Sequence, residues 1–201
     1  SPVLFTFDNK RLIVESNRGR DKTAIFEFDP STAKEGKLIA EHPTVDMGSV
    51  SYSRKRKVLT TANYTTWKGE RQFLDKEAET MFKSVEKKLP GYEIAFISTN
   101  KAEDKYIVAT FNDKSRGKRY LYDKASDTLE FIADISPWLP ENALSDMKPI
   151  SYQARDGLTI NGYLTLPKGG AVKNLPVIVN PHGGPWARDQ WRFNPEVQFL
   201  A

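Results

Sequence analysis

The amino-acid sequence predicts a mainly β chain in two parts: a partial β-propeller of about three blades, and then the opening strands of an α/β domain. Two observations carry this prediction. A strand–turn–strand pattern recurs along the first 145 residues. Near residue 148 the pattern changes and leads into a continuous apolar run. We therefore expect the propeller part at residues 1–146 and the second domain at residues 147–201.

One unit recurs three times in the first part. Each copy is an apolar strand, a turn rich in Lys, Arg and Gly, and a second strand that closes on an aspartate. The closing residues Asp29, Asp75 and Asp123 lie 46 and 48 residues apart. A further strand follows two of the copies, at residues 37–40 and 129–132. A period of about 40–50 residues with several strands per unit is typical of propeller blades, because one small sheet cannot bury both faces alone.

Three copies are fewer than the roughly 4–8 blades that close a propeller. We expect that blades are missing on the N-terminal side, and an open array of repeats is the alternative. The first part of the chain is then the C-terminal part of a propeller.

A helix is predicted to interrupt the repeat at residues 76–89, where apolar residues recur at helical spacing. Asp75 suits the N-cap, and Pro90-Gly91 suits the end. We expect this helix to be inserted in a blade and packed on its side. A lid over a substrate entrance is the alternative interpretation.

The second part begins after a proline-containing linker at residues 136–142. Residues 150–154 and 158–166 read as two strands around a tight turn, and the alternation in the second predicts a half-buried antiparallel strand. The uninterrupted run at residues 177–179 suits a strand covered on both faces. Asn194 and Pro195 suit the N-cap and first position of a helix.

Composition excludes several classes of site. The chain has no cysteine, so disulfides, zinc–cysteine sites and thiol nucleophiles are ruled out. Basic residues number 30 and acidic residues 26, and the basic runs at residues 54–57 and 114–119 fit solvated turns better than a nucleic-acid surface. No apolar run approaches the ~18 residues of a membrane span. We expect no cofactor, metal, nucleic-acid or membrane partner; a cytoplasmic and a periplasmic location both stay open.

The motif richest in chemical meaning is His182-Gly183-Gly184-Pro185, which follows the run at residues 177–179. Several serine hydrolases build half of an oxyanion hole from such a turn. Acyl transfer places negative charge on a carbonyl oxygen, and backbone N–H groups about 3 Å away stabilise it. Glycine lets the chain pass close to a substrate, and Pro185 fixes the chain direction afterwards. The alternative is a plain turn between a strand and a helix.

These parts together resemble one family. The hairpin at residues 156–167, the stretch at residues 175–185 and the segment at residues 198–201 resemble the prolyl oligopeptidase family of serine peptidases, especially its acylaminoacyl-peptidase and dipeptidyl-peptidase-like branch. The resemblance covers essentially the whole chain and is specific over residues 147–201. It implies a propeller that gates access of oligopeptides to an α/β-hydrolase domain, in which a Ser-Asp-His triad cleaves them.

The resemblance also assigns roles within the turn. It implies that the Gly184 N–H is the oxyanion donor and that Gly183 shapes the turn. His182 and Pro185 are expected to orient the loop, so His182 does not titrate in the mechanism. For Trp186 and Arg188, a place facing the substrate cavity and a place on the surface of the following loop both stay open.

The family's nucleophile lies in a Gly-x-Ser-x-Gly elbow, and this sequence contains none. We therefore expect the triad to lie beyond Ala201, the α/β-hydrolase domain to be truncated before the nucleophile, and the 201-residue chain to be inactive. Neither His42 nor His182 is then the catalytic base. The remainder of the same polypeptide is an expected partner, and homo-oligomerisation is left open. An esterase or lipase and a non-catalytic propeller interaction protein are the competing functions.

Overall fold

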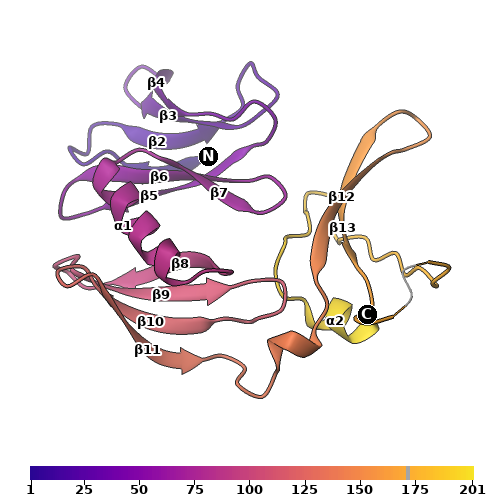
Figure 1. The fold of residues 1–201 in the computed structure, drawn as a ribbon. Coiled ribbons are helices and arrows are strands. Elements are labelled where there is room, and N and C mark those ends of the chain that lie inside the picture. The colour runs from indigo at the N-terminus through magenta and orange to yellow at the C-terminus, as the bar shows by residue number, and fades with distance from the viewer. Residues whose placement is uncertain (171–172) are drawn as a thin grey trace. The chain divides into compact units, whose positions relative to one another are not determined.

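Antiparallel strands are the main regular structure of the chain, which the computed structural model describes at residues 1–170 and 173–201 (Figure 1). The mainly β fold class is confirmed. The chain divides into two compact units, Ser1–Ser84 with Lys101–Glu103, and Val85–Asn100 with Asp104–Ala201. The domain boundary predicted between residues 146 and 147 lies inside the second unit and stays a prediction.

The first unit contains two antiparallel sheets whose strands are neighbours in sequence order. The four-stranded sheet consists of β1 (Pro2–Phe5), β2 (Leu12–Ser16), β3 (Ala24–Asp29) and β4 (Lys34–Ala40). The three-stranded sheet consists of β5 (Met47–Ser53), β6 (Val58–Thr65) and β7 (Gly69–Phe73). Apolar side chains from both sheets form one buried cluster: Ile13, Ile25, Ala40, Met47, Val50 and Ala62. This shared core gives each sheet the cover that it lacks alone.

The second unit contains a third meander of the same kind, and it also holds the segments that follow it. The meander consists of β8 (Glu93–Thr99), β9 (Lys105–Phe111), β10 (Lys118–Asp123) and β11 (Thr128–Asp134). The remaining elements are the 3-10 helix η1 (Glu141–Ala143), the hairpin β12 (Met147–Gln153) and β13 (Thr159–Thr165), and helix α2 (Pro195–Leu200).

The predicted repeat is confirmed. Its strand pairs are β2–β3, β6–β7 and β9–β10, and the further strands predicted near residues 37–40 and 129–132 belong to β4 and β11. The pattern missed the first strand of each sheet. In β5 the buried positions are Met47, Val50 and Ser53, because the ladder to β6 shifts register twice and breaks the two-residue alternation.

The repeated aspartates act alike at the ends of their strands. A carboxylate oxygen of each accepts a backbone N–H of the following turn: from Ser31 to Asp29 at 2.9 Å, from Ala78 to Asp75 at 2.8 Å, and from Ala125 to Asp123 at 2.9 Å. Hydrogen bonds from partner side chains hold the pKa of all three carboxyls below its ordinary value: from Ser31 to Asp29, from Arg56 to Asp75, and from Lys105 to Asp123. The aspartate that marks the repeat in the sequence is therefore the turn-closing residue of each sheet.

Helix α1 (Lys76–Lys88) confirms the predicted insertion, and Asp75 caps its first turn. The helix follows β7, the third strand of its sheet. In the other two sheets the third strand is followed by a fourth strand, β4 or β11. The rings of Phe82 and Phe73 lie 5.6 Å apart, and the Arg71 guanidinium lies 3.8 Å from the centre of the Phe82 ring. The middle of the helix therefore packs on the last strand of the three-stranded sheet.

Replacing Asp75 with alanine is expected to destabilise the protein by about 2 kcal/mol, because the helix loses its cap and Arg56 loses a bidentate carboxylate partner. Urea unfolding of the full-length protein measures this. The pKa of Asp75 is lowered from 3.8 by Arg56, so the contribution is present above that value and is lost as the pH falls through the folded-state pKa. Asp21→Ala is the matched control, since that side chain is 88% exposed. Equal stability of both variants would contradict the prediction.

The basic run at residues 54–57 is part of the first unit's own structure. Glu103 accepts hydrogen bonds from the backbone N–H groups of Arg54 and Lys55 at 2.8 and 3.1 Å. The Lys55 ammonium donates to the carbonyl of Ala102 at 2.9 Å. Burial raises the pKa of Glu103, but the hydrogen bonds from Ser53 and these amides outweigh it and lower the pKa. These contacts hold the start of the run in a structured turn within the first unit.

The β12–β13 hairpin confirms the two predicted strands and their tight turn, in which Gly157 N–H donates to the Ala154 carbonyl at 3.0 Å. The expected half-burial of the second strand is wrong. Leu158 is 62% exposed, Ile160 37% and Leu164 40%. The register pairs Tyr152 with Ile160, so apolar side chains of both strands lie on one face of a sheet of only two strands.

The predicted strand at residues 177–179 does not form. Val177 is 81% exposed, Ile178 62% and Val179 82%, and no strand within the described residues pairs with them. A strand needs a neighbour for its backbone N–H and C=O groups, and β12 and β13 pair only with each other. No helix in the described part of the chain has the length and apolar character to cross a bilayer.

Candidate functional site

The turn His182–Pro185 lies in an exposed stretch that runs from residue 176 to residue 190. Gly184 has φ +154°, a backbone conformation that side-chain-bearing residues rarely adopt. A Cβ at this position would lie 3.2 Å from the Trp186 nitrogen and 3.4 Å from the Ala187 Cβ. The turn therefore requires glycine at position 184 for its shape.

The backbone N–H groups of this turn are available to a ligand. Within the described residues, no backbone hydrogen bond engages the N–H of Gly183 or Gly184. The backbone hydrogen bond next to the turn lies just after it, where the Ala187 N–H donates to the Pro185 carbonyl at 3.0 Å. A pair of uncommitted N–H groups beside a glycine-only bend is the arrangement that can bind a developing oxyanion.

His182 contacts its own loop. The Nδ1 atom of its ring lies 2.8 Å from the Gly183 carbonyl oxygen. A carbonyl only accepts, so this hydrogen bond requires the tautomer with a proton on Nδ1. The contact fixes the direction of the peptide between the two glycines, which supports a loop-orienting role for His182 and leaves that role a proposal.

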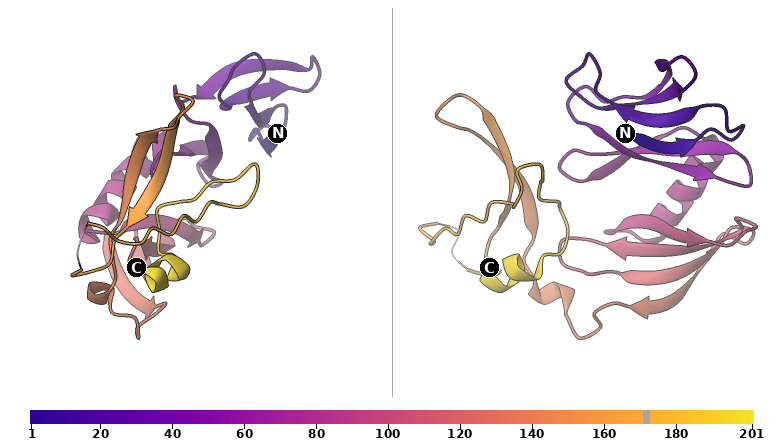
Figure 2. Two further views of the ribbon diagram at one scale, coloured as in Figure 1. Left: turned by 90° about the vertical axis from the view of Figure 1, so that its right-hand side faces the viewer. Right: turned by 180° about the vertical axis from the view of Figure 1, so that it is seen from behind.

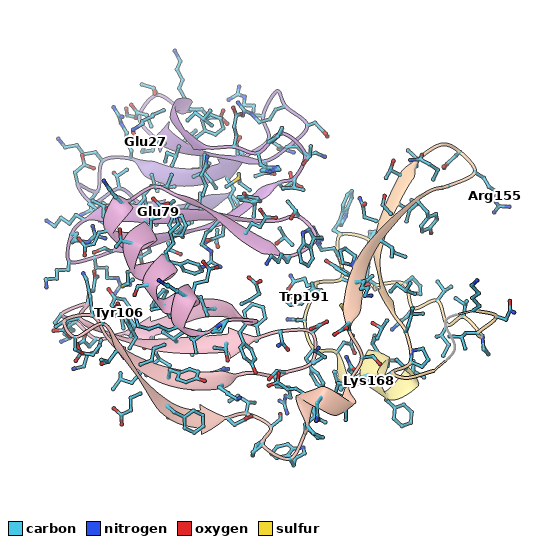
Figure 3. The ribbon with its side chains drawn as sticks, in the orientation of Figure 1. Glu27, Glu79, Tyr106, Arg155, Lys168 and Trp191 are labelled. Atoms are coloured by element: carbon cyan, nitrogen blue, oxygen red, sulfur yellow. The ribbon has the colours of Figure 1, made fainter. Side chains whose placement is uncertain are left out.

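The tryptophans and the arginine that follow the turn separate into two groups. Trp186 is 97% exposed, and the Arg188 Nε donates to the Asp189 carbonyl at 3.2 Å. Both residues are exposed and belong to the same stretch as the glycine turn. Trp191, labelled in Figure 3, lies elsewhere: its indole N–H donates to the Met147 carbonyl at 2.9 Å, at the start of β12.

Helix α2 confirms the predicted cap. The Asn194 Oδ1 accepts the N–H groups of Glu196 and Val197 at 3.0 and 3.2 Å. Just before the cap, the Phe193 N–H donates to the Asn112 carbonyl at 2.8 Å. The chain that leaves the turn is therefore attached to the loop between β9 and β10.

Sequence reasoning missed this attachment. The repeat pattern indicates only a turn between the two strands of this copy, whereas the adjacent Asn112 and Asp113 directly after an apolar strand are the signal for a structured turn. The described residues bring together no group of three or more His, Asp or Glu side chains that could hold a metal ion.

Comparison with known proteins places this geometry in context. No family model matches the chain. The chain is 28% identical over 209 residues to dipeptidyl aminopeptidase BIII of Pseudoxanthomonas mexicana, in an alignment that covers 100% of the chain and 30% of that protein. It also resembles a solved structure from a study of two prolyl endopeptidases and their inter-domain dynamics, with a TM-score of 0.53 and 15% identity over 80% of this chain and 23% of that one. The chain thus spans less than a third of the length of either relative.

Proposed function

We propose that this chain is part of a serine peptidase of the prolyl oligopeptidase family, one that hydrolyses short peptides. The observation that carries the proposal is the exposed glycine turn at residues 182–185, with its uncommitted N–H groups, in a chain that aligns over its whole length with a dipeptidyl aminopeptidase. In this proposal residues 1–146 are the C-terminal part of a propeller that gates peptide access, and residues 147–201 begin the hydrolase domain.

The proposed role of the turn follows from acyl-transfer chemistry. When a nucleophile attacks the scissile carbonyl, its oxygen gains negative charge in the tetrahedral intermediate. The Gly184 N–H donates to that oxygen, and Gly183, His182 and Pro185 set the path of the backbone. A fixed N–H dipole needs no reorganisation at the moment of reaction, which is why one such donor contributes on the order of 10²–10³ in rate.

The proton transfers are assigned to residues outside the chain. The His42 Nδ1 lies 3.3 Å from the N–H groups of both Thr44 and Val45, so this ring caps its own turn. His182 is engaged with Gly183. In this proposal the serine, aspartate and histidine of the triad lie in the parent protein beyond Ala201, and the present chain contributes only the oxyanion side.

A fluorophosphonate probe tests the proposal, because it reacts covalently with an activated serine. The full-length protein is expected to be labelled at one serine beyond residue 201 and to cleave dipeptidyl amide substrates. The chain of residues 1–201, produced alone, is expected to show no labelling, and heat-denatured full-length protein is the control.

Other outcomes separate the competing functions. Labelling with hydrolysis of p-nitrophenyl esters but not of peptides would indicate an esterase. A full-length protein that the probe does not label would indicate a binding module. Labelling of the 201-residue chain would contradict the placement of the nucleophile.

A further inference from the structure

Buried polar side chains gather in and beside the loop that joins β9 to β10, residues 112–117, called here the β9–β10 loop. Thr110, Asn112, Asp113 and Ser115 are each at most 7% exposed. Burying a polar group costs free energy unless it is hydrogen-bonded. The fold therefore has to supply hydrogen-bond partners for these side chains.

The Asp113 carboxylate holds the start of the hairpin. Its Oδ2 accepts the N–H of Met147, the first residue of β12, at 2.7 Å. A hydrogen bond to a charged, buried acceptor is stronger than one between neutral groups. The neighbouring Lys114 ammonium pairs with Asp146 at 2.6 Å, which adds a second link to the same short segment.

The Gln198 side chain, on α2, joins both segments at once. Its Oε1 accepts the Ser145 N–H at 2.9 Å, and its Nε2 donates to the Ser145 carbonyl at 2.8 Å and to the Asp113 carbonyl at 3.2 Å. The amide thus pairs with Ser145 as a neighbouring peptide group would in a strand ladder. Both polar atoms of Gln198 are satisfied, as a part-buried amide requires.

Two more hydrogen bonds attach the same part of the chain, from Trp191 to Met147 and from the Phe193 backbone to Asn112. Both views in Figure 2 show α2 and the chain leading into it beside the start of the hairpin. Residues 191–198 are therefore fixed to the β9–β10 loop and to residues 145–147. Residues 176–190, which contain the glycine turn, are exposed throughout.

We propose that the β9–β10 loop of the third sheet positions the glycine turn of the peptidase, and that Asp113 and Gln198 are its positioning residues. The proposal rests on the proposed function above. The turn lacks a packed surface of its own, so the anchored residues that follow it limit where the Gly184 N–H can lie. A misplacement of about 1 Å at a reacting centre costs on the order of 10²-fold in rate.

The test uses the full-length enzyme and two substitutions, one at the Gln198 amide and one at the Asp113 carboxylate. Gln198→Leu keeps the side-chain size and removes the three hydrogen bonds, and Asp113→Ala removes the acceptor for Met147. We expect kcat per active site, counted by fluorophosphonate titration, to fall roughly 10- to 100-fold in both, with KM changed by less than about threefold. The inhibition constant of a dipeptidyl boronic acid, which forms a tetrahedral adduct, should rise in parallel with the loss of kcat.

Two further variants provide a rescue and a control for the proposed positioning role. Asp113→Asn retains an oxygen that accepts the Met147 N–H, so it should restore kcat to within about threefold of wild type, and this pair decides the matter should Gln198→Leu fail to fold. Gln72→Leu, at an exposed position in β7, is the matched control and should leave turnover unchanged. Unchanged kcat in Asp113→Ala, or equal losses in Asp113→Ala and Asp113→Asn, would overturn the inference. A wild-type enzyme without peptidase activity would instead overturn the proposed function, and the inference with it.

Discussion

Replacing Gly184 with alanine in the full-length protein is expected to lower kcat on the order of 10²-fold while leaving the fold intact. Alanine resists φ near +154°, and its Cβ would lie 3.2 Å from the Trp186 nitrogen. The peptide has to rotate to relieve the backbone strain and the close contact. This rotation moves the N–H that is proposed to donate to the oxyanion. Steady-state kinetics on a dipeptidyl amide substrate measures the loss, with active sites counted by titration.

Gly162→Ala is the matched control, because the nearest atom to its added Cβ is in the Ile150 side chain at an ordinary 3.8 Å. That variant should keep wild-type turnover. Gly184→Pro removes the N–H outright and should cost 10²–10³-fold. Full turnover in both Gly184 variants would show that another group donates to the oxyanion.

Much of the fold could be predicted because local signals and tertiary structure agree. Asp75 caps α1 and closes a repeat, and Asn194 caps α2, so short-range chemistry determined these boundaries. The first strands of the sheets were missed for a local reason: in β5 two register shifts break the alternation that identifies a strand. Bulged strands have no simple period to recognise.

The candidate site could be predicted only in part. The glycine turn is a contiguous motif, so its residues were evident from the sequence. Its anchorage was not, because the hydrogen bond from Gln198 to Asp113 joins residues 85 positions apart. The apolar run at residues 177–179 led to a wrong strand prediction for a related reason: apolar character reports a tendency to be covered, whereas a strand also needs a hydrogen-bonding neighbour.

Gly117→Ala is expected to cause the largest loss of stability, about 4 kcal/mol in the unit that holds β8–β11. Gly117 has φ +92°, and an added Cβ would lie 1.5 Å from the Thr110 carbonyl oxygen and 2.6 Å from its carbon. These are backbone atoms of the neighbouring strand, which cannot rotate away as a side chain would. The Gly117 carbonyl also accepts the Ile135 N–H at 3.0 Å, so a shift of residue 117 disturbs the chain after β11 as well.

Hydrogen exchange on the full-length protein localises this effect. Amides of β9 and β10 should lose protection, whereas those of β2 and β6, in the other unit, should keep it. Gly69→Ala is the control, since nothing lies within 4 Å of its added Cβ, and it should change the free energy of unfolding by less than about 0.5 kcal/mol. Undiminished protection of β9 and β10 in Gly117→Ala would contradict the prediction. Gly117 is the last residue of the β9–β10 loop, which also contains Asp113. The fraction of Gly117→Ala that remains folded should therefore also have a lower kcat, as expected if that loop positions the glycine turn.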